Sequence, residues 1–139
     1  MTVGFELVEH TADIGVHAWG KTRAEVFEEA ARGMFSLICD PGDIGQEQSL
    51  EIEVEAPRQD MLLVAWLNEL LYLFEAHHVL FADFEVTDVD MTSLHARVTG
   101  EALRPGHQAV CGGVKAATYH QLSLTPTERG WEAQVFLDV

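Results

Sequence analysis

The segment at residues 60–77 limits the possible folds more than any other part of the chain. Nearly every position in 61–74 is apolar, and the polar positions Asn68, Glu69 and Glu75 form only a narrow edge. A helix that is apolar nearly all round is covered on more than one side. The run is shorter than the roughly 18 residues that a membrane-spanning helix requires. The sequence therefore predicts a central core helix.

The rest of the chain reads as one more helix and a series of strands. Thr22 and Glu25 have the spacing of a capping box, and an amphipathic helix follows it up to the turn at 40–42. Leucine, isoleucine and valine alternate with glutamates over 50–56, as in a strand with one solvated face. Other strands are expected at 5–8, 13–19, 83–90, 93–101, 114–124 and 131–137. This order predicts an α+β fold, a single domain over 1–139 with two helices packed on a mostly antiparallel sheet of about seven strands.

The charge of the chain restricts its partners. Twenty-three acidic residues against eight basic ones give a net charge of −15. Such a surface repels phosphate backbones, so tight binding to nucleic acid is not expected, and a basic protein partner or a cation is favoured. The glutamates at 51, 53 and 55 are interpreted as a solvated face, with a docking strip for a basic partner as the alternative.

The chain shows no secretory pattern and no membrane span. Cys39 and Cys111 lie far apart without a CxxC motif, which is typical of reduced, buried cysteines in a cytoplasmic protein. A disulfide between them is the less favoured alternative. Neither cysteine has a histidine at a recognised catalytic spacing, and GxSxG and phosphate-loop motifs do not occur. Nucleophilic catalysis therefore has little support.

Asp13, Lys115 and Asp138 fall off the apolar alternation of their strands, which frees their side chains to project from the less apolar side of the sheet. If Asp13 and Asp138 met, the terminal carboxylate of Val139 would be close by. An all-oxygen set of this kind suits a hard cation such as Ca²⁺ or Mg²⁺. Lys115 could offset the negative charge or contact a phosphate. The ordinary alternative is that both aspartates are simply solvated.

The histidines permit a second metal hypothesis. His10, His17 and His120 could hold zinc together with Asp13, although their spacing matches no known motif. In the aspartate hypothesis, His10 orients Asp13 and His120 is a further supporting residue. The ordinary interpretation of His120 is a hydrogen-bonded core residue, because it lies on the apolar side of its expected strand.

Five sequence blocks, in order and over nearly the whole length, resemble the archease family. They are HTADIG at 10–15, AARGMF at 30–35, WLNELLY at 66–72, VKAATYH at 114–120 and LDV at 137–139. Five ordered blocks make this resemblance far more specific than a single short motif.

The resemblance implies a non-enzymatic activator of the RtcB-type RNA ligase of tRNA splicing and RNA repair. In that family the activator promotes guanylylation of the ligase histidine by GTP and multiple turnover. The resemblance also implies a metal site, often calcium with Mg²⁺ or Mn²⁺ possible, whose ligands match Asp13, Asp138 and the terminal Val139. Lys115 matches a functionally important lysine, whereas Gly113 stands where the family usually has an acid. The rival classes are a general acidic, chaperone-like binding module and a metal-dependent hydrolase that uses His10 or His120.

Overall fold

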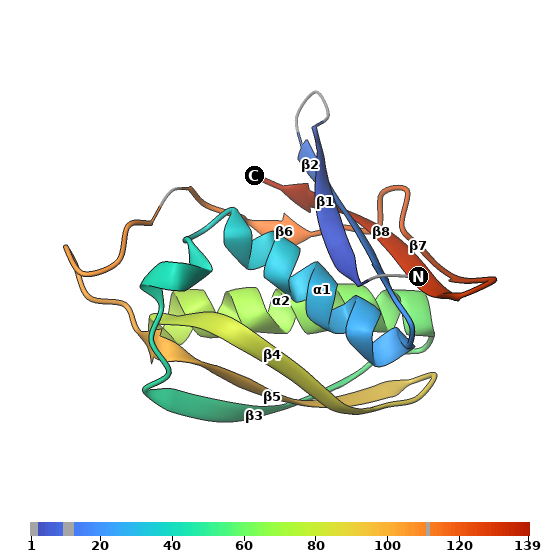
Figure 1. Cartoon of the computed structure of the whole chain (residues 1–139), viewed down its shortest axis with the longest axis horizontal. Helices are drawn as coiled ribbons and strands as arrows, with labels where there is room; N and C mark the ends of the chain where they lie inside the picture. The colour runs from blue at the N-terminus through green and yellow to red at the C-terminus, as the bar shows by residue number, and fades with distance from the viewer. Residues whose placement is uncertain (1–2, 10–12, 111) are drawn as a thin grey trace.

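The computed structural model describes residues 3–9, 13–110 and 112–139, and these contain two α-helices and eight strands (Figure 1). The helices are α1 (Arg23–Ser36) and α2 (Gln59–His77), and a short 3₁₀ helix, η1, spans Pro41–Asp43. The strands are β1 (Gly4–Glu9), β2 (Asp13–Gly20), β3 (Gln48–Glu55), β4 (Val79–Val89), β5 (Ser93–Ala102), β6 (Ala116–Ala117), β7 (Ser123–Thr127) and β8 (Gly130–Asp138).

The strands form two antiparallel sheets. The larger sheet has the order β1-β2-β8-β6, with β7 also paired to β8, and the smaller has the order β3-β5-β4. The α+β class with two helices is therefore confirmed, but the expected single sheet is divided into two. Figure 1 shows the two sheets on opposite sides of α2.

The helix α2 lies in the centre of the molecule, as its apolar circumference predicts. It contacts strands of both sheets as well as α1, and its side chains contribute to one buried cluster shared by both sheets. Trp66 is fully buried, and its indole N–H donates a hydrogen bond of 2.9 Å to the carbonyl oxygen of Phe27. Among the described residues, no helix is both long enough and apolar enough to cross a membrane.

Two local predictions are also confirmed. The Thr22 hydroxyl accepts from the Glu25 amide at 3.1 Å, and the Glu25 carboxylate accepts from the Thr22 amide at 3.1 Å, which completes the capping box of α1. The three glutamates of β3 are exposed, and Glu51 pairs with Arg97 at 3.1 Å. This arrangement agrees with a solvated face.

The prediction of one continuous strand over 114–124 is wrong. Only β6 and β7 are extended there, and the chain turns between them, where Gln121 has a φ of 49° and the Leu122 amide donates to the Tyr119 carbonyl. On the α2 side of β6, the Asn68 side chain bonds the main chain of Ala117 in place of another strand. Because of this turn, His120 is exposed, so its interpretation as a core histidine is also wrong.

Cys39 is buried, as expected. Cys111 lies outside the described residues, so its reduced and buried state stays a prediction.

Candidate metal site

Asp13 and Asp138 lie directly opposite each other in the larger sheet. Asp13 begins β2 and Asp138 ends β8, and the antiparallel register pairs these two residues. Residues paired in this way project from the same face, with their Cβ atoms about 4.5–5.5 Å apart. The two ends of the chain therefore meet, as the metal hypothesis requires, and Figure 1 shows the C-terminus close to the beginning of β2.

The alternation of side chains explains why both carboxylates point away from the core. The neighbouring pair, Ile14 and Leu137, projects toward the helices, and Leu137 is fully buried. Asp13 is half-buried with its Oδ1 shielded from solvent, whereas Asp138 is exposed. Two like charges directly opposite each other are destabilising, which makes this position favourable for a cation.

The segment that carries Lys115 is attached to the same end of the sheet. The Lys115 amide donates to the Asp138 carbonyl oxygen at 2.7 Å, and Ala116 lies opposite Asp138 in the register. The side chains of Lys115 and Val139 are both exposed. The fold thus brings Asp13, Asp138, Val139 and Lys115 to one end of the five-stranded sheet from three separate parts of the sequence.

Asn68 of α2 anchors β6, which follows Lys115 directly in the chain. Its Oδ1 accepts from the Ala117 amide at 2.8 Å, and its Nδ2 donates to the Ala117 carbonyl oxygen at 3.2 Å. One side chain thereby satisfies both main-chain groups of β6 that face α2. Sequence analysis assigned Asn68 no role beyond the polar edge of α2. Its position as a polar residue in an otherwise apolar helix was the available signal.

Replacing Asn68 with alanine should cost about 1–3 kcal/mol of stability, because it leaves the Ala117 N–H and C=O without their partner. Urea denaturation measures the loss, with Glu75→Ala, an exposed change on the same helix, as the control. A loss below about 0.5 kcal/mol, the usual range for surface changes, would contradict the role of Asn68 as an anchor of β6.

The described histidines contact partners other than Asp13. His17 is four residues along β2, about 13 Å away at the usual rise of a strand. Its ring instead lies between Glu6 and Glu132, with nitrogen–oxygen distances of 3.0 and 3.4 Å. His120 packs edge-on against Phe136 at a ring distance of 5.7 Å. His10 lies outside the described residues, so its role beside Asp13 stays a prediction.

The donor chemistry of the site fits a hard cation. Within the described ranges, no three side chains of His, Cys, Asp or Glu converge to hold a metal. The aspartate pair would therefore need further oxygen ligands from the main chain, the terminal carboxylate of Val139 or water. Such ligand sets are typical of Ca²⁺ and Mg²⁺, whereas zinc prefers nitrogen and sulfur.

Comparison with known proteins shows which family this chain resembles. Residues 5–139 match the model of the archease protein family (MTH1598/TM1083). The chain is 41% identical to the protein archease of Methanosarcina barkeri, over 97% of this chain and 95% of that protein. It is 34% identical to the protein archease of Pyrococcus furiosus, over 97% of this chain and 98% of that protein.

Solved structures give the same picture of the fold. The solution structure of Methanobacterium thermoautotrophicum protein 1598 superposes with a TM-score of 0.84 at 32% identity, covering 98% of this chain and 99% of that one. The crystal structure of an archease, described as a possible chaperone, from Thermotoga maritima has a TM-score of 0.65 at 18% identity. That comparison covers 95% of this chain and 94% of the other, and at this identity it supports the fold alone.

Proposed function

Because this chain belongs to the archease family, we propose that it is a non-enzymatic activator of an RtcB-type RNA ligase in tRNA splicing or RNA repair. The reaction that it promotes is guanylylation of the ligase, in which a ligase histidine attacks the α-phosphorus of GTP and pyrophosphate leaves. Faster guanylylation after each ligation allows multiple turnover. The observation that carries the proposal is the pairing of Asp13 with Asp138.

Each residue at this end of the sheet has a role in the proposal. Asp13 and Asp138, with an oxygen of Val139, would hold a divalent cation, which we expect to be Ca²⁺, with Mg²⁺ or Mn²⁺ as alternatives. Held there, the ion would supply positive charge for phosphate oxygens. The exposed Lys115 ammonium contacts the ligase or a phosphate of GTP. Asn68 keeps β6, and therefore Lys115, in register with Asp138.

The net charge supports a protein partner. A surface with a charge of −15 attracts a basic, RNA-binding ligase and does not compete with it for RNA. The same charge concentrates cations near the aspartate pair.

Ligase turnover tests this proposal. Ligase alone and ligase with the protein are compared across a chelator series, for the unaltered chain and for Asp138→Ala. The unaltered chain should raise turnover, and Asp138→Ala should not. Because chelators also remove metal from the ligase, calorimetric titration of the isolated protein with Ca²⁺ measures its own site directly.

The two rival classes give different results. A chaperone-like module would stimulate equally with and without Asp138, and a hydrolase would consume a substrate without any ligase. Unchanged ligase turnover in the presence of folded protein would rule out the proposed function.

A further inference from the structure

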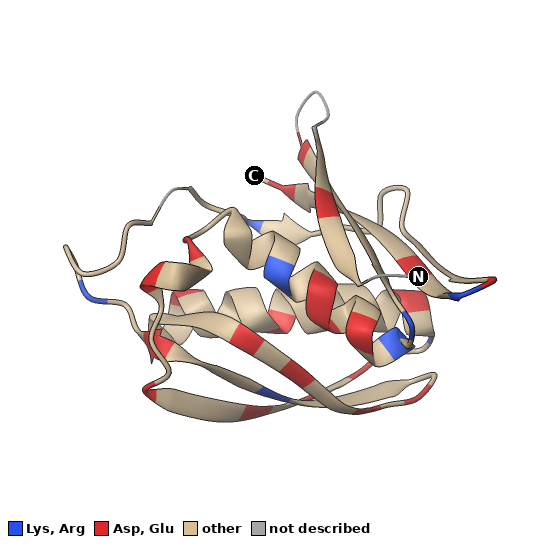
Figure 2. Ribbon diagram, viewed as in Figure 1, with Lys and Arg blue, Asp and Glu red and all other residues tan. Residues whose placement is uncertain are grey.

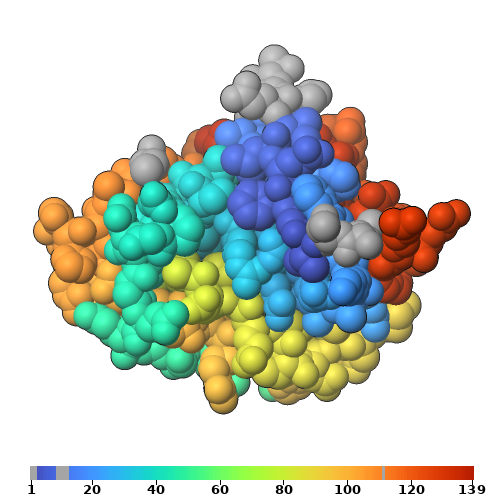
Figure 3. Space-filling view, viewed as in Figure 1, coloured from blue at the N-terminus to red at the C-terminus, as the bar shows by residue number. Residues whose placement is uncertain are grey.

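The strand β1 is an open edge of the larger sheet. It pairs with β2 on one side, and within the described residues no strand covers its other side. An open edge presents main-chain N–H and C=O groups on which another chain can pair, so proteins usually protect such edges. Figure 3 shows β1 at the surface, beside the atoms of α1.

Both edges of the smaller sheet are protected, whereas β1 has less protection. The edge strand β3 of the smaller sheet has glutamates at alternate positions along its exposed face. Its other edge, β4, has two register shifts, and Glu28 of α1 accepts from the Val86 amide at 2.8 Å. Burial of the Glu28 carboxyl raises its pKa above the ordinary value, the cost of placing an acid there. In contrast, β1 has no lysine, no proline and no register shift with β2, and Glu6 is an exposed charge on this strand. Leu7 beside Glu6 is 41% exposed.

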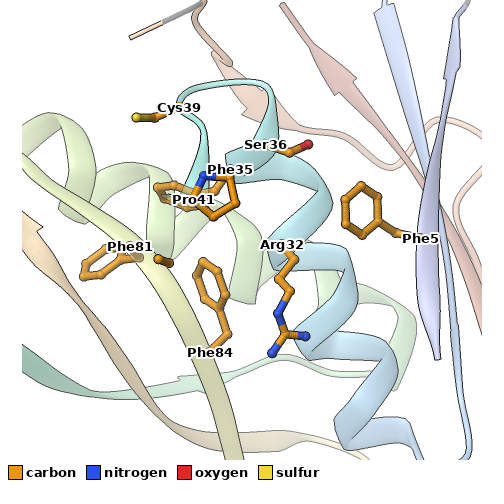
Figure 4. A pocket seen from close by; sticks show the side chains of 9 residues that line it. Phe5, Arg32, Phe35, Ser36, Cys39, Pro41, Phe81 and Phe84 are labelled. Atoms are coloured by element: carbon orange, nitrogen blue, oxygen red, sulfur yellow. The ribbon is translucent and has the colours of Figure 1, made fainter. Parts of the chain in front are cut away.

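A cavity adjoins this open edge. It has a volume of about 260 Å³ and lies between β1, α1 and β4 (Figure 4). Phe5 lines it from β1, Phe35 from α1, and Phe81 and Phe84 from β4. The rings of Phe35 and Phe81 meet edge-on at 5.7 Å. An apolar cavity of this size can accept one aromatic or aliphatic side chain.

The cavity and the exposed part of β1 face the same side of the sheet. Phe5 lies opposite Ala18 and Leu7 lies opposite Val16, and both partners are buried toward α1. A strand added to β1 would lie about 4.8 Å beyond it, with every second side chain on this same side. One such side chain would lie above the cavity that Phe5 already lines.

The surroundings favour a basic occupant. Arg32 lines the cavity, but it is paired with Glu29 on the same helix turn. Figure 2 shows acidic positions along β1, α1 and β4 on this face. A second copy of the chain would bring another charge of −15 to this surface, so self-pairing is disfavoured.

We propose that β1 binds an extended, basic segment of the ligase as an added strand, with one apolar side chain of that segment in the cavity. Main-chain hydrogen bonds to β1 supply affinity, and the cavity supplies specificity, as in other cases of strand addition. The identity of the partner rests on the proposed function. This surface differs from the aspartate pair: it docks the ligase and does not contact GTP.

Leu7→Lys tests the proposal, with Met91→Lys as the matched control because Met91 is also an exposed apolar residue, at 56%, outside β1. A lysine is a typical protective residue of an edge strand. The concentration that gives half-maximal ligase stimulation should be at least about 10 times higher for Leu7→Lys than for the unaltered chain. Stimulation at saturation should be unchanged. Met91→Lys should behave like the unaltered chain. Equal half-maximal concentrations for the two variants would overturn the proposal.

Hydrogen exchange separates this proposal from the proposed function. Adding ligase should slow exchange of the β1 amides that face away from β2, whether or not turnover rises. If the unaltered chain fails to stimulate the ligase, the proposed function is wrong. If, in addition, the ligase does not slow exchange of the β1 amides, the proposed docking surface is wrong as well. Protection that grows with the concentration of the protein alone would identify a second copy as the occupant and would also overturn the proposal.

Discussion

Replacing Asp13 or Asp138 with asparagine should abolish stimulation of the ligase while the protein stays folded and becomes slightly more stable. Asparagine keeps the shape of the side chain but removes the charge that a hard cation requires. We expect cation affinity to fall by about 100-fold or more, since even residues that only orient metal ligands affect affinity by about 10–100-fold. Calorimetric titration with Ca²⁺ and a ligase turnover assay measure the two losses.

The sign of the stability change distinguishes a functional site from a structural one. The two carboxylates lie opposite each other in register, and such like-charge pairs cost about 0.2–1 kcal/mol without a counter-ion. Each asparagine variant should therefore raise the melting temperature of the metal-free protein and remove the further stabilisation by Ca²⁺. The double variant should stimulate no less than either single variant, because in the proposed function both residues would hold the same ion.

Glu132→Gln is the matched control for the aspartates. It removes one negative charge from the same face of β8, beside His17 and away from the aspartate pair. It should leave Ca²⁺ affinity and ligase stimulation within about twofold of the unaltered chain, because exposed charges contribute little at a distance. Full stimulation by Asp13→Asn and Asp138→Asn would show that the paired carboxylates have no part in activation.

The second large effect is on folding: Gly100→Ala should destabilise the protein by at least about 3 kcal/mol. Gly100 lies in β5, where β4 shifts its register between Phe81 and Asp83. A Cβ added to Gly100 would lie 1.7 Å from the Leu80 carbonyl oxygen and 2.8 Å from the Phe81 Cα atom. Both are main-chain atoms of the adjacent strand, so the strands must separate to admit the methyl group.

Thermal unfolding measures this loss, and a fall in melting temperature of about 10 °C or more is expected for a domain of this size. Gly113→Ala is the control, since nothing lies within 4 Å of a Cβ added at that position. It should change stability by no more than about 0.5 kcal/mol. Equal melting temperatures for the two variants would show that β4 and β5 can separate at little cost.

Sequence periodicity predicted those parts of the fold that depend on local pattern. The apolar circumference of α2, the capping box at Thr22 and the alternation along β3 all lead directly to the observed elements. The same alternation placed Asp13 and Asp138 on the polar side of their strands. Their direct pairing could not be read from either strand alone, because strand register is set by the packed sheet.

The parts that the sequence did not predict depend on contacts between distant residues. The division into two sheets arises because α2 is covered on two sides and each side needs its own layer. The pattern at 114–124 alternates like one long strand, but Asn68 from α2 takes the main-chain groups of Ala117 and a turn follows. The exposure of His120 is a consequence of that turn.

The place of β8 in the sheet affects when the protein can act during its synthesis. The strand β8 follows all the other described strands in the chain, yet it is inserted between β2 and the short strands β6 and β7. Contacts between residues so far apart in the chain form slowly, because a long loop must close before they are made. A nascent or prematurely terminated chain can therefore form its helices without joining Asp13 to Asp138. In the proposed function, cation binding by the aspartate pair would therefore require that β8 has already been inserted beside β2.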